Sequence, residues 1–82
     1  MHQYTILLFG PAAAAAKLNR VVVESADLCS ADQLKDLVSL QFPDLDVYLQ
    51  AGRLAVNQSF VAGDTTVLAD DETALITMVS GG

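Results

Sequence analysis

The stretch QYTILLF, residues Gln3–Phe9, decides how this chain of 82 residues is expected to fold. It is rich in β-branched and aromatic residues, which favour strands, and its apolar residues follow one another without alternation. This pattern is typical of a strand whose two faces are both covered. We therefore expect Gln3–Phe9 to be a strand in the centre of a sheet, with the remaining elements arranged around it.

The segment after this strand is expected to bring the chain back along its edge. Gly10 and Pro11 interrupt the extended run, and the alanine-rich segment 12–19 is too short for a stable amphipathic helix, so we predict a turn or two of helix on a surface loop. RVVVESA, residues Arg20–Ala26, is a second β-branched run. It is most simply the return strand of a hairpin with a long connection.

One amphipathic helix is predicted in the middle of the chain, over SADQLKDLVSLQF, residues Ser30–Phe42. Ser30 and Gln33 stand at the spacing of a capping box, which marks the start of a helix. Pro43 ends it, because the residue before a proline is biased out of the α region. One apolar stripe that can lie on a sheet is formed by Leu34, Leu37, Val38 and Phe42.

The second half of the chain is predicted to add short strands. VYLQAGRLAVNQ, residues Val47–Gln58, is interpreted as a strand, a turn at Ala51–Gly52 with Gly52 free to take positive φ, and a second strand. A loop with a brief extended piece follows, and Glu72–Ser80 is a late apolar strand that begins at the acidic turn. The predicted fold class is α+β, a mixed sheet with one main helix packed across it.

Length and composition indicate one small domain over residues 1–82, in which 52% of the residues are hydrophobic. A chain of this size has little stability to spare for a deep active-site cleft. Its formal net charge of −6, with only four basic residues, argues against nucleic acid as a ligand. The densest charge run, Asp70 to Glu72, is either a solvated turn or an acidic patch that steers the domain onto a basic partner.

The cysteine and histidine content excludes several kinds of site. Cys29 is the single cysteine and His2 the single histidine, so the chain has no intramolecular disulfide and no set of zinc ligands. We expect Cys29 to be a buried structural residue and the protein to suit a reducing cytoplasm. The apolar run Ile6–Ala16 is too short to cross a membrane and has no basic residue before it, so we interpret it as strand and loop rather than as a signal peptide.

The chain ends in MVSGG, residues Met78–Gly82. Glycine loses more backbone entropy on ordering than any other residue and adds no side chain to a core. Two final glycines therefore indicate either a soft terminus or a tail whose last carboxylate must be reached by another molecule. We predict that residues 78–82 form an extended tail.

The predicted order of elements is that of the ubiquitin-like β-grasp, in which the first and last strands lie parallel in the centre of the sheet. Several segments strengthen the likeness, namely ILLFGPAAAA near the start, LAVNQSFV (Leu54–Val61), ADDE (Ala69–Glu72), TALITMVS and the final Gly81-Gly82. Together they resemble the MoaD family of sulfur carriers, the small subunits of molybdopterin synthase. The resemblance covers essentially the whole chain.

Two departures from the family pattern are visible. Many relatives have a glycine in the acidic turn, where this chain has Asp70-Asp71, and many have two prolines where this chain has Thr77-Met78. Because proline fixes φ, their loss leaves the entry to the tail less rigid. Neither departure affects the diglycine.

The resemblance implies a chemical role for the last two residues. Gly82 would be adenylated by an E1-like, MoeB-like enzyme and converted to a thiocarboxylate, a covalent 1-thioglycine. Gly81 would give clearance where the tail passes through narrow channels, because a Cβ there would clash. No cofactor or metal is expected to be bound.

The resemblance also implies partners. The sulfur would be donated to cyclic pyranopterin monophosphate, to form the dithiolene of molybdopterin, in a site of a MoaE-like large subunit. Two large and two small chains would form a heterotetramer, in which this chain is a non-catalytic subunit. The exposed apolar residues of the sheet, together with the tail, would form the docking surface, and neither nucleic acid nor a membrane is implied.

Three other functions are compatible with the sequence. A ThiS-like sulfur carrier for thiazole synthesis shares the fold, the diglycine and the first chemical step, but the AVNQ stretch and the tail favour the molybdopterin branch. A ubiquitin-like protein modifier would join Gly82 to lysines of its targets after the same adenylation. An interaction domain with a soft terminus would use neither glycine.

Overall fold

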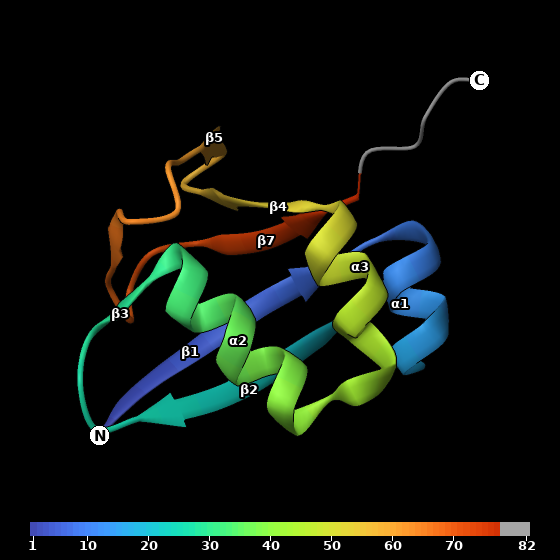
Figure 1. Ribbon diagram of the computed structural model, residues 1–82, viewed down its shortest axis with the longest axis horizontal. Coiled ribbons are helices and arrows are strands. Elements are labelled where there is room, and N and C mark those ends of the chain that lie inside the picture. Colours follow the sequence, from blue (N-terminus) through green and yellow to red (C-terminus); the bar gives the residue numbers. More distant parts are fainter. Residues whose placement is uncertain (78–82) are drawn as a thin grey trace.

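A computed structural model of the chain describes residues 1–77 and contains a mixed sheet in the order β2-β1-β7-β4-β5. β1 and β7 run parallel side by side in the centre, and the other neighbours in this sheet are antiparallel (Figure 1). β3 and β6 form a separate antiparallel pair. The strands are β1 (His2–Leu8), β2 (Arg20–Ser25), β3 (Cys29–Ser30), β4 (Arg53–Val56), β5 (Ser59–Phe60), β6 (Thr66–Val67) and β7 (Thr73–Ile76).

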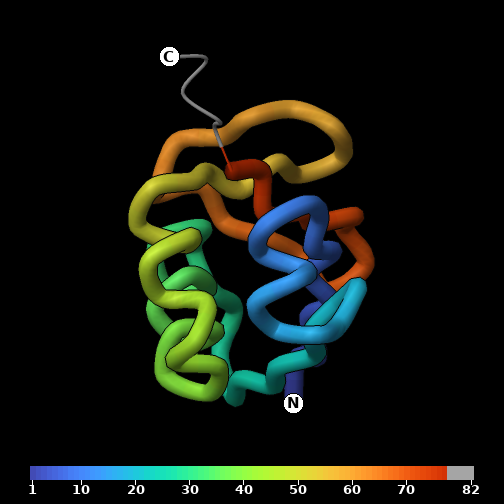
Figure 2. The backbone as a smooth tube through the Cα atoms, turned by 90° about the vertical axis from the view of Figure 1, so that its right-hand side faces the viewer, coloured from blue at the N-terminus to red at the C-terminus, as the bar shows by residue number. Residues whose placement is uncertain are grey.

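The helices cover one face of this sheet, with α2 crossing in front of β1 and β2 (Figures 1 and 2). α2 begins after Ser30, and the predicted capping box is confirmed, because the Ser30 and Gln33 side chains each accept a hydrogen bond from the other residue's backbone N–H. Leu34 and Val38 of its apolar stripe are fully buried. The helices are α1 (Gly10–Ala16), α2 (Ala31–Gln41), the 3₁₀ turn η1 (Pro43–Leu45) and α3 (Asp46–Ala51).

The central position predicted for the first strand is confirmed, but its two-sided burial is wrong. Tyr4, Ile6 and Leu8 point into the core, whereas Gln3 and Thr5 on the opposite face are exposed. Helices cover only the core face, so the outer face of the sheet is not covered by the described part of the chain (Figure 2). Apolar residues that were expected to face a second layer therefore lie on an open surface.

Two further predictions are corrected by the helices. The alanine-rich segment is a regular helix, α1, that starts earlier than expected, at Gly10, and buries Ala12 in the core. Residues 47–50, predicted as a strand, and Ala51 of the predicted turn belong to helix α3, because η1 leads directly into α3 and Leu45 and Leu49 are both buried. β4 begins only at Arg53.

A buried tyrosine joins the two sheets. The Tyr4 hydroxyl donates a hydrogen bond to the Val67 carbonyl of β6 and accepts one from the Cys29 N–H of β3, each at 3.0 Å. Tyr4 and Val67 are almost completely buried, so these polar groups have no access to water. Cys29 is itself buried, as predicted, and its place beside Tyr4 is structural.

Replacing Tyr4 by phenylalanine is expected to lower the free energy of unfolding by about 1–3 kcal/mol, because the Val67 carbonyl and Cys29 N–H lose a buried partner. Urea denaturation followed by circular dichroism measures this loss. Tyr48→Phe is the matched control, since Tyr48 is only partly buried. Equal losses in the two variants would contradict this role for the Tyr4 hydroxyl.

Candidate functional site

The last described strand leads the chain out from the centre of the sheet. β7 pairs with β1 on one side and with β4 on the other, so its course is set from both edges. Only five residues follow Thr77, and among them are the predicted site residues Gly81 and Gly82, which lie outside the described residues. The candidate site of residues 1–77 is therefore the surface next to the end of β7.

An apolar groove of about 380 Å³ lies on the outer face beside this strand. The register of β7 with β4 places Ala55 opposite Ala74 and Arg53 opposite Ile76 on this face, while the core side takes Leu54 and Leu75. The groove is lined by Phe9, Ala55, Gln58, Phe60, Glu72, Ala74 and Ile76, and we call this set the outer-face groove.

Two exposed phenylalanines belong to the outer-face groove. Phe9 is 54% exposed and Phe60 is 46% exposed, although burying such a side chain is favourable. The Arg53 guanidinium lies over the Phe60 ring, 4.7 Å from its centroid, which adds a cation–π contact at the rim. Contiguous apolar surface with a polar rim is typical of a protein-binding site.

The family resemblance implied an apolar docking surface on the sheet but not the residues that form it. Phe60 lies in a two-residue strand, too short to show any periodicity. Phe9 was expected at the end of a buried strand, whereas it precedes α1 and is exposed. The signal that was available is the alternation along β7, where Ala74 and Ile76 share the face opposite to Leu75.

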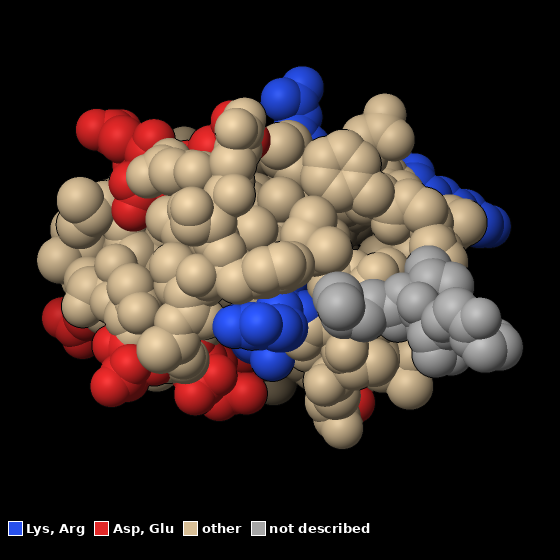
Figure 3. Space-filling view, turned by 90° about the horizontal axis from the view of Figure 1, so that it is seen from above, with Lys and Arg blue, Asp and Glu red and all other residues tan. Residues whose placement is uncertain are grey.

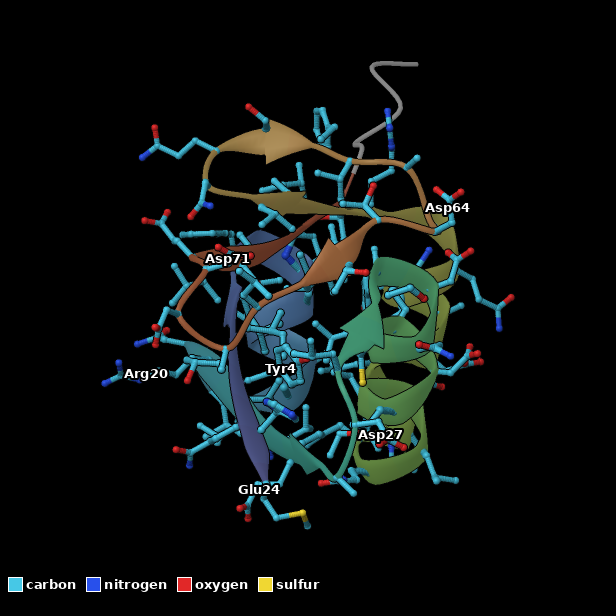
Figure 4. All side chains as sticks on the ribbon, turned by 90° about the vertical axis from the view of Figure 1, so that its left-hand side faces the viewer. Tyr4, Arg20, Glu24, Asp27, Asp64 and Asp71 are labelled. Atoms are coloured by element: carbon cyan, nitrogen blue, oxygen red, sulfur yellow. The ribbon has the colours of Figure 1, made fainter. Side chains whose placement is uncertain are left out.

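The AVNQ stretch and the acidic turn, quoted separately in the sequence, lie against each other. Asn57 Nδ2 donates to Asp71 Oδ1 at 3.1 Å, and the Glu72 N–H donates to Asn57 Oδ1 at 3.0 Å. Asp71 Oδ2 also accepts from the Leu68 N–H at 2.9 Å. We call these contacts the Asn57–Asp71 latch, and Figure 4 shows Asp71 beside the β4–β5 hairpin.

The latch holds a turn in which two residues other than glycine have positive φ. Asn57 and Gln58 have φ angles of 52° and 68°, as a two-residue type I′ hairpin turn requires. Asparagine tolerates positive φ better than most residues. Both the nitrogen and the oxygen of the Asn57 side-chain amide are hydrogen-bonded to the acidic turn. The hairpin in turn carries Phe60, so the latch positions one wall of the outer-face groove.

The acidic residues are distributed unevenly over the surface. Asp71 is engaged in the latch, while Asp70 and Glu72 are exposed. Figure 3 shows carboxylates gathered toward one end of the molecule, and basic side chains near the middle and toward the other end with uncharged surface between them. In the Asp70–Glu72 run, the Asp71 carboxylate therefore holds the turn together. The exposed carboxylates of Asp70 and Glu72 remain available to a basic partner.

A second hollow of about 380 Å³ lies between α2 and α3, and three of its polar residues are paired with one another. The Ser39 hydroxyl donates to Asp46 Oδ1 at 2.5 Å, and Gln50 Nε2 donates to Oδ2 at 2.8 Å. These hydrogen bonds to Ser39 and then Gln50 lower the pKa of Asp46 below its ordinary value. A carboxylate held ionised in this way is poorly suited to act as a general acid.

Within residues 1–77, no three or more His, Cys, Asp and Glu side chains are arranged to hold a metal ion. None of the helices in that range has the length and apolar character needed to cross a bilayer.

Gly52 adjoins the end of β7, and the reason for the glycine differs from the one predicted. Its φ is −101°, so positive φ is not required. A Cβ at this position would lie 2.6 Å from the Ile76 carbonyl oxygen and 2.8 Å from that of Tyr48. Gly52 therefore allows the end of α3 to approach the backbone of β7 just before the chain leaves the sheet.

Comparison with protein families gives one match, since the model of the ThiS family matches residues 6–82. No curated protein sequence matches the chain.

Solved structures share the fold at low sequence identity. SAMP1 from Haloferax volcanii is similar with a TM-score of 0.83 and 23% identity, over 98% of this chain and 99% of that one. A putative molybdopterin converting factor subunit 1 from Pyrococcus furiosus has a TM-score of 0.82 and 13% identity, over 96% and 100%. A complex of subunits 1 and 2 of the molybdopterin-converting factor from Helicobacter pylori matches with a TM-score of 0.68 and 18% identity, over 98% and 99%.

Replacing Gly52 by alanine is expected to destabilise the domain by about 1–3 kcal/mol, because the added methyl group meets two backbone oxygens that cannot rotate away. Gly63→Ala is the matched control. Its methyl group would meet the carboxylate of Asp32, an exposed side chain that can move. Thermal unfolding of both variants tests this, and a loss for Gly63→Ala as large as that for Gly52→Ala would contradict the explanation.

Proposed function

The chain belongs to the ThiS family, and from this premise we propose that it is a sulfur carrier whose Gly82 holds the sulfur as a thiocarboxylate. The observation that carries the proposal is the course of β7. A central strand, paired on both sides, leads out beside an apolar groove and is followed by a short segment that ends in two glycines. A docking surface and a reactive terminus would thus be presented together.

The chemistry proposed for Gly82 needs an activating enzyme, because a carboxylate is a poor acyl donor. On an E1-like enzyme, a carboxylate oxygen of Gly82 attacks the α-phosphorus of ATP and releases pyrophosphate. A sulfur nucleophile then attacks the acyl carbon and expels AMP, which leaves a thiocarboxylate. Gly81 provides clearance for the tail, since glycine lacks a Cβ. The covalent 1-thioglycine is the active form, without a bound cofactor.

Within this chemistry, we propose that the pathway is molybdenum cofactor biosynthesis. LAVNQSFV and the acidic turn support this choice, and the latch between Asn57 and Asp71 gives these segments a common structural role. The carrier would dock on a large subunit through the outer-face groove and place Gly82 in that subunit's site. Its thiocarboxylate sulfur would attack cyclic pyranopterin monophosphate on the way to the molybdopterin dithiolene.

In this role the chain is a non-catalytic subunit of a sulfurtransferase complex. The groups that bind the substrate phosphate and transfer protons would come from the large subunit, and two copies of each chain would form a heterotetramer. We place the complex in the cytoplasm, where a reducing environment suits a thiocarboxylate and the single buried cysteine.

A second candidate function, that of a protein modifier, is favoured by the structural likeness to SAMP1, since a structure of the same protein is described as that of a small archaeal modifier protein. The same acyl-adenylate at Gly82 would then react with a lysine amine of a target to form an isopeptide bond. A thiazole-pathway carrier remains the alternative within sulfur transfer, and it differs only in the acceptor of the sulfur.

The sulfur-carrier proposal predicts a mass change at the C-terminus. Incubation of the full chain with ATP, an E1-like adenylating enzyme of the molybdopterin pathway and inorganic sulfide should add the mass difference between sulfur and oxygen. A variant without Gly82 should show no change, since it ends on a different carboxyl group. Intact-mass spectrometry measures both. An unchanged mass of the full chain, with an enzyme proven active on another carrier, would overturn the proposal.

The choice of pathway is tested with the thiocarboxylated chain. Mixed with a molybdopterin synthase large subunit and cyclic pyranopterin monophosphate, it should yield molybdopterin, detected by fluorescence after oxidation. Absence of product together with isopeptide-linked conjugates in cell extract would favour the modifier. Sulfur transfer to a thiazole synthase instead would assign the chain to that pathway.

The docking role predicted for the outer-face groove is tested by Phe60→Asp, which places a charge where an apolar contact is needed. Binding to the large subunit should weaken about tenfold or more, as for the loss of a central aromatic contact. Val47→Asp is the control, because Val47 is 65% exposed on α3, away from the groove. Titration calorimetry measures both, and equal affinities would place the interface elsewhere.

A further inference from the structure

β2 is a free edge of the main sheet, since it pairs with β1 and has no other neighbour among residues 1–77. The Leu8 N–H donates to the Asn19 carbonyl at 2.8 Å, one step beyond the β1–β2 register. Backbone hydrogen bonds alternate in an antiparallel pair, so Val21 and Val23 point theirs toward β1. The N–H and C=O groups of Arg20, Val22 and Glu24 therefore point away from the sheet.

The side chains of these three residues make the edge self-complementary. All three are exposed on the outer face, and Figure 4 shows Arg20 and Glu24 extending away from α2. On β1, Arg20 stands opposite Leu7 and Glu24 opposite Gln3, so neither charge meets an opposite charge across the strand pair. An antiparallel copy of the same strand, centred on Val22, would place Arg20 opposite Glu24 twice.

We propose that two copies of this chain associate through their β2 edges to form a continuous sheet across a two-fold axis at Val22. Arg20 of each copy pairs with Glu24 of the other, and Val22 meets its own counterpart. The outward backbone groups of these residues are then satisfied in hydrogen-bonded pairs. Opposite charges directly across a strand pair stabilise it, whereas like charges destabilise it.

Exposed apolar side chains also lie near this edge of the sheet. Leu28 and Leu40, which are 46% and 78% exposed, line a hollow of about 350 Å³ next to the end of β2. The contact area is small and each copy has a net charge of −6, so the dimer is a weak one.

This association is independent of the proposed sulfur chemistry. β2 and β5 form opposite edges of the sheet, and the outer-face groove involves residues of β4, β5 and β7. Each copy in the dimer therefore keeps its groove open, and one assembly presents two grooves and two C-termini. Failure of the dimer would leave the function of Gly82 untouched, and the reverse also holds.

Charge reversal on β2 provides the test, because Arg20 and Glu24 are exposed and their replacement should leave the fold intact. Sedimentation equilibrium of the full chain at fixed ionic strength should show a monomer–dimer equilibrium. Arg20→Glu and Glu24→Arg should each weaken it about tenfold or more, since both cross-strand pairs become repulsive. The double variant R20E/E24R should restore it, and a mixture of the two single variants should form heterodimers.

Matched controls carry the same charge changes away from β2. Lys35→Glu on α2 and Asp64→Arg in the loop before β6 alter residues outside the strand and should leave dimerisation nearly unchanged. A chain that stays monomeric at millimolar concentration would overturn the proposal. So would equal effects of the β2 and control variants, which would indicate general charge repulsion, or a double variant that fails to recover.

Amide hydrogen exchange locates the interface by a second readout. The N–H groups of Arg20, Val22 and Glu24 should become protected as the protein concentration rises, while those of Val21 and Val23 are protected at every concentration by β1. Concentration-dependent protection on β5 in place of β2 would assign self-association to the other edge and overturn the proposal.

Discussion

The parallel pairing of β1 with β7 is the constraint on which the rest of the structure depends. It joins Ile6 to Thr73 and Leu8 to Leu75, so the two ends of the chain close the sheet at its centre. The entropy cost of bringing such distant segments together must be offset by burial, and Ile6 and Leu75 are both completely buried. The last strand is therefore held in the centre of the sheet, paired on both sides.

The central strand was predictable from its composition, but the environment of its second face was not. A continuous apolar run is expected where both faces are buried, and the same run occurs where one face is kept for a partner. Leu7 and Phe9 illustrate the ambiguity, because they lie on the outer face and continue the apolar run of the core residues. A single sequence describes the chain without its partner, so it cannot distinguish these two situations.

The segment before β4 was misassigned because its pattern is too short to have a clear period. Val47 and Tyr48 favour a strand, yet η1 starts at Pro43 and leads the chain straight into α3. Gly52 was assigned to a turn on general grounds, whereas it is needed for the close approach of the Ile76 and Tyr48 carbonyls. By contrast, α2 was predicted closely, because the capping box at Ser30 and the proline at 43 are local signals that need no tertiary information.

The Asn57–Asp71 latch shows how a sequence motif that suggests function can have a structural basis. The two segments that supported the resemblance are fourteen residues apart at these positions, and they meet through side-chain hydrogen bonds on both sides of the Asn57 amide. Their immediate effect is to hold a type I′ turn and, through it, the position of Phe60. Residue types alone could indicate that both segments matter, but only the fold reveals that they act as one unit.

The architecture also suits the role proposed for so small a domain. A core of this size cannot enclose a substrate, and in the described residues the polar side chains at Tyr4, Asp46 and Asp71 are engaged in holding elements together. The features available for function therefore lie on the surface, where an apolar groove adjoins the end of β7. A carrier built in this way needs only a rigid face for recognition and a terminus that another protein can reach, and the enclosed reaction site can belong to the partner.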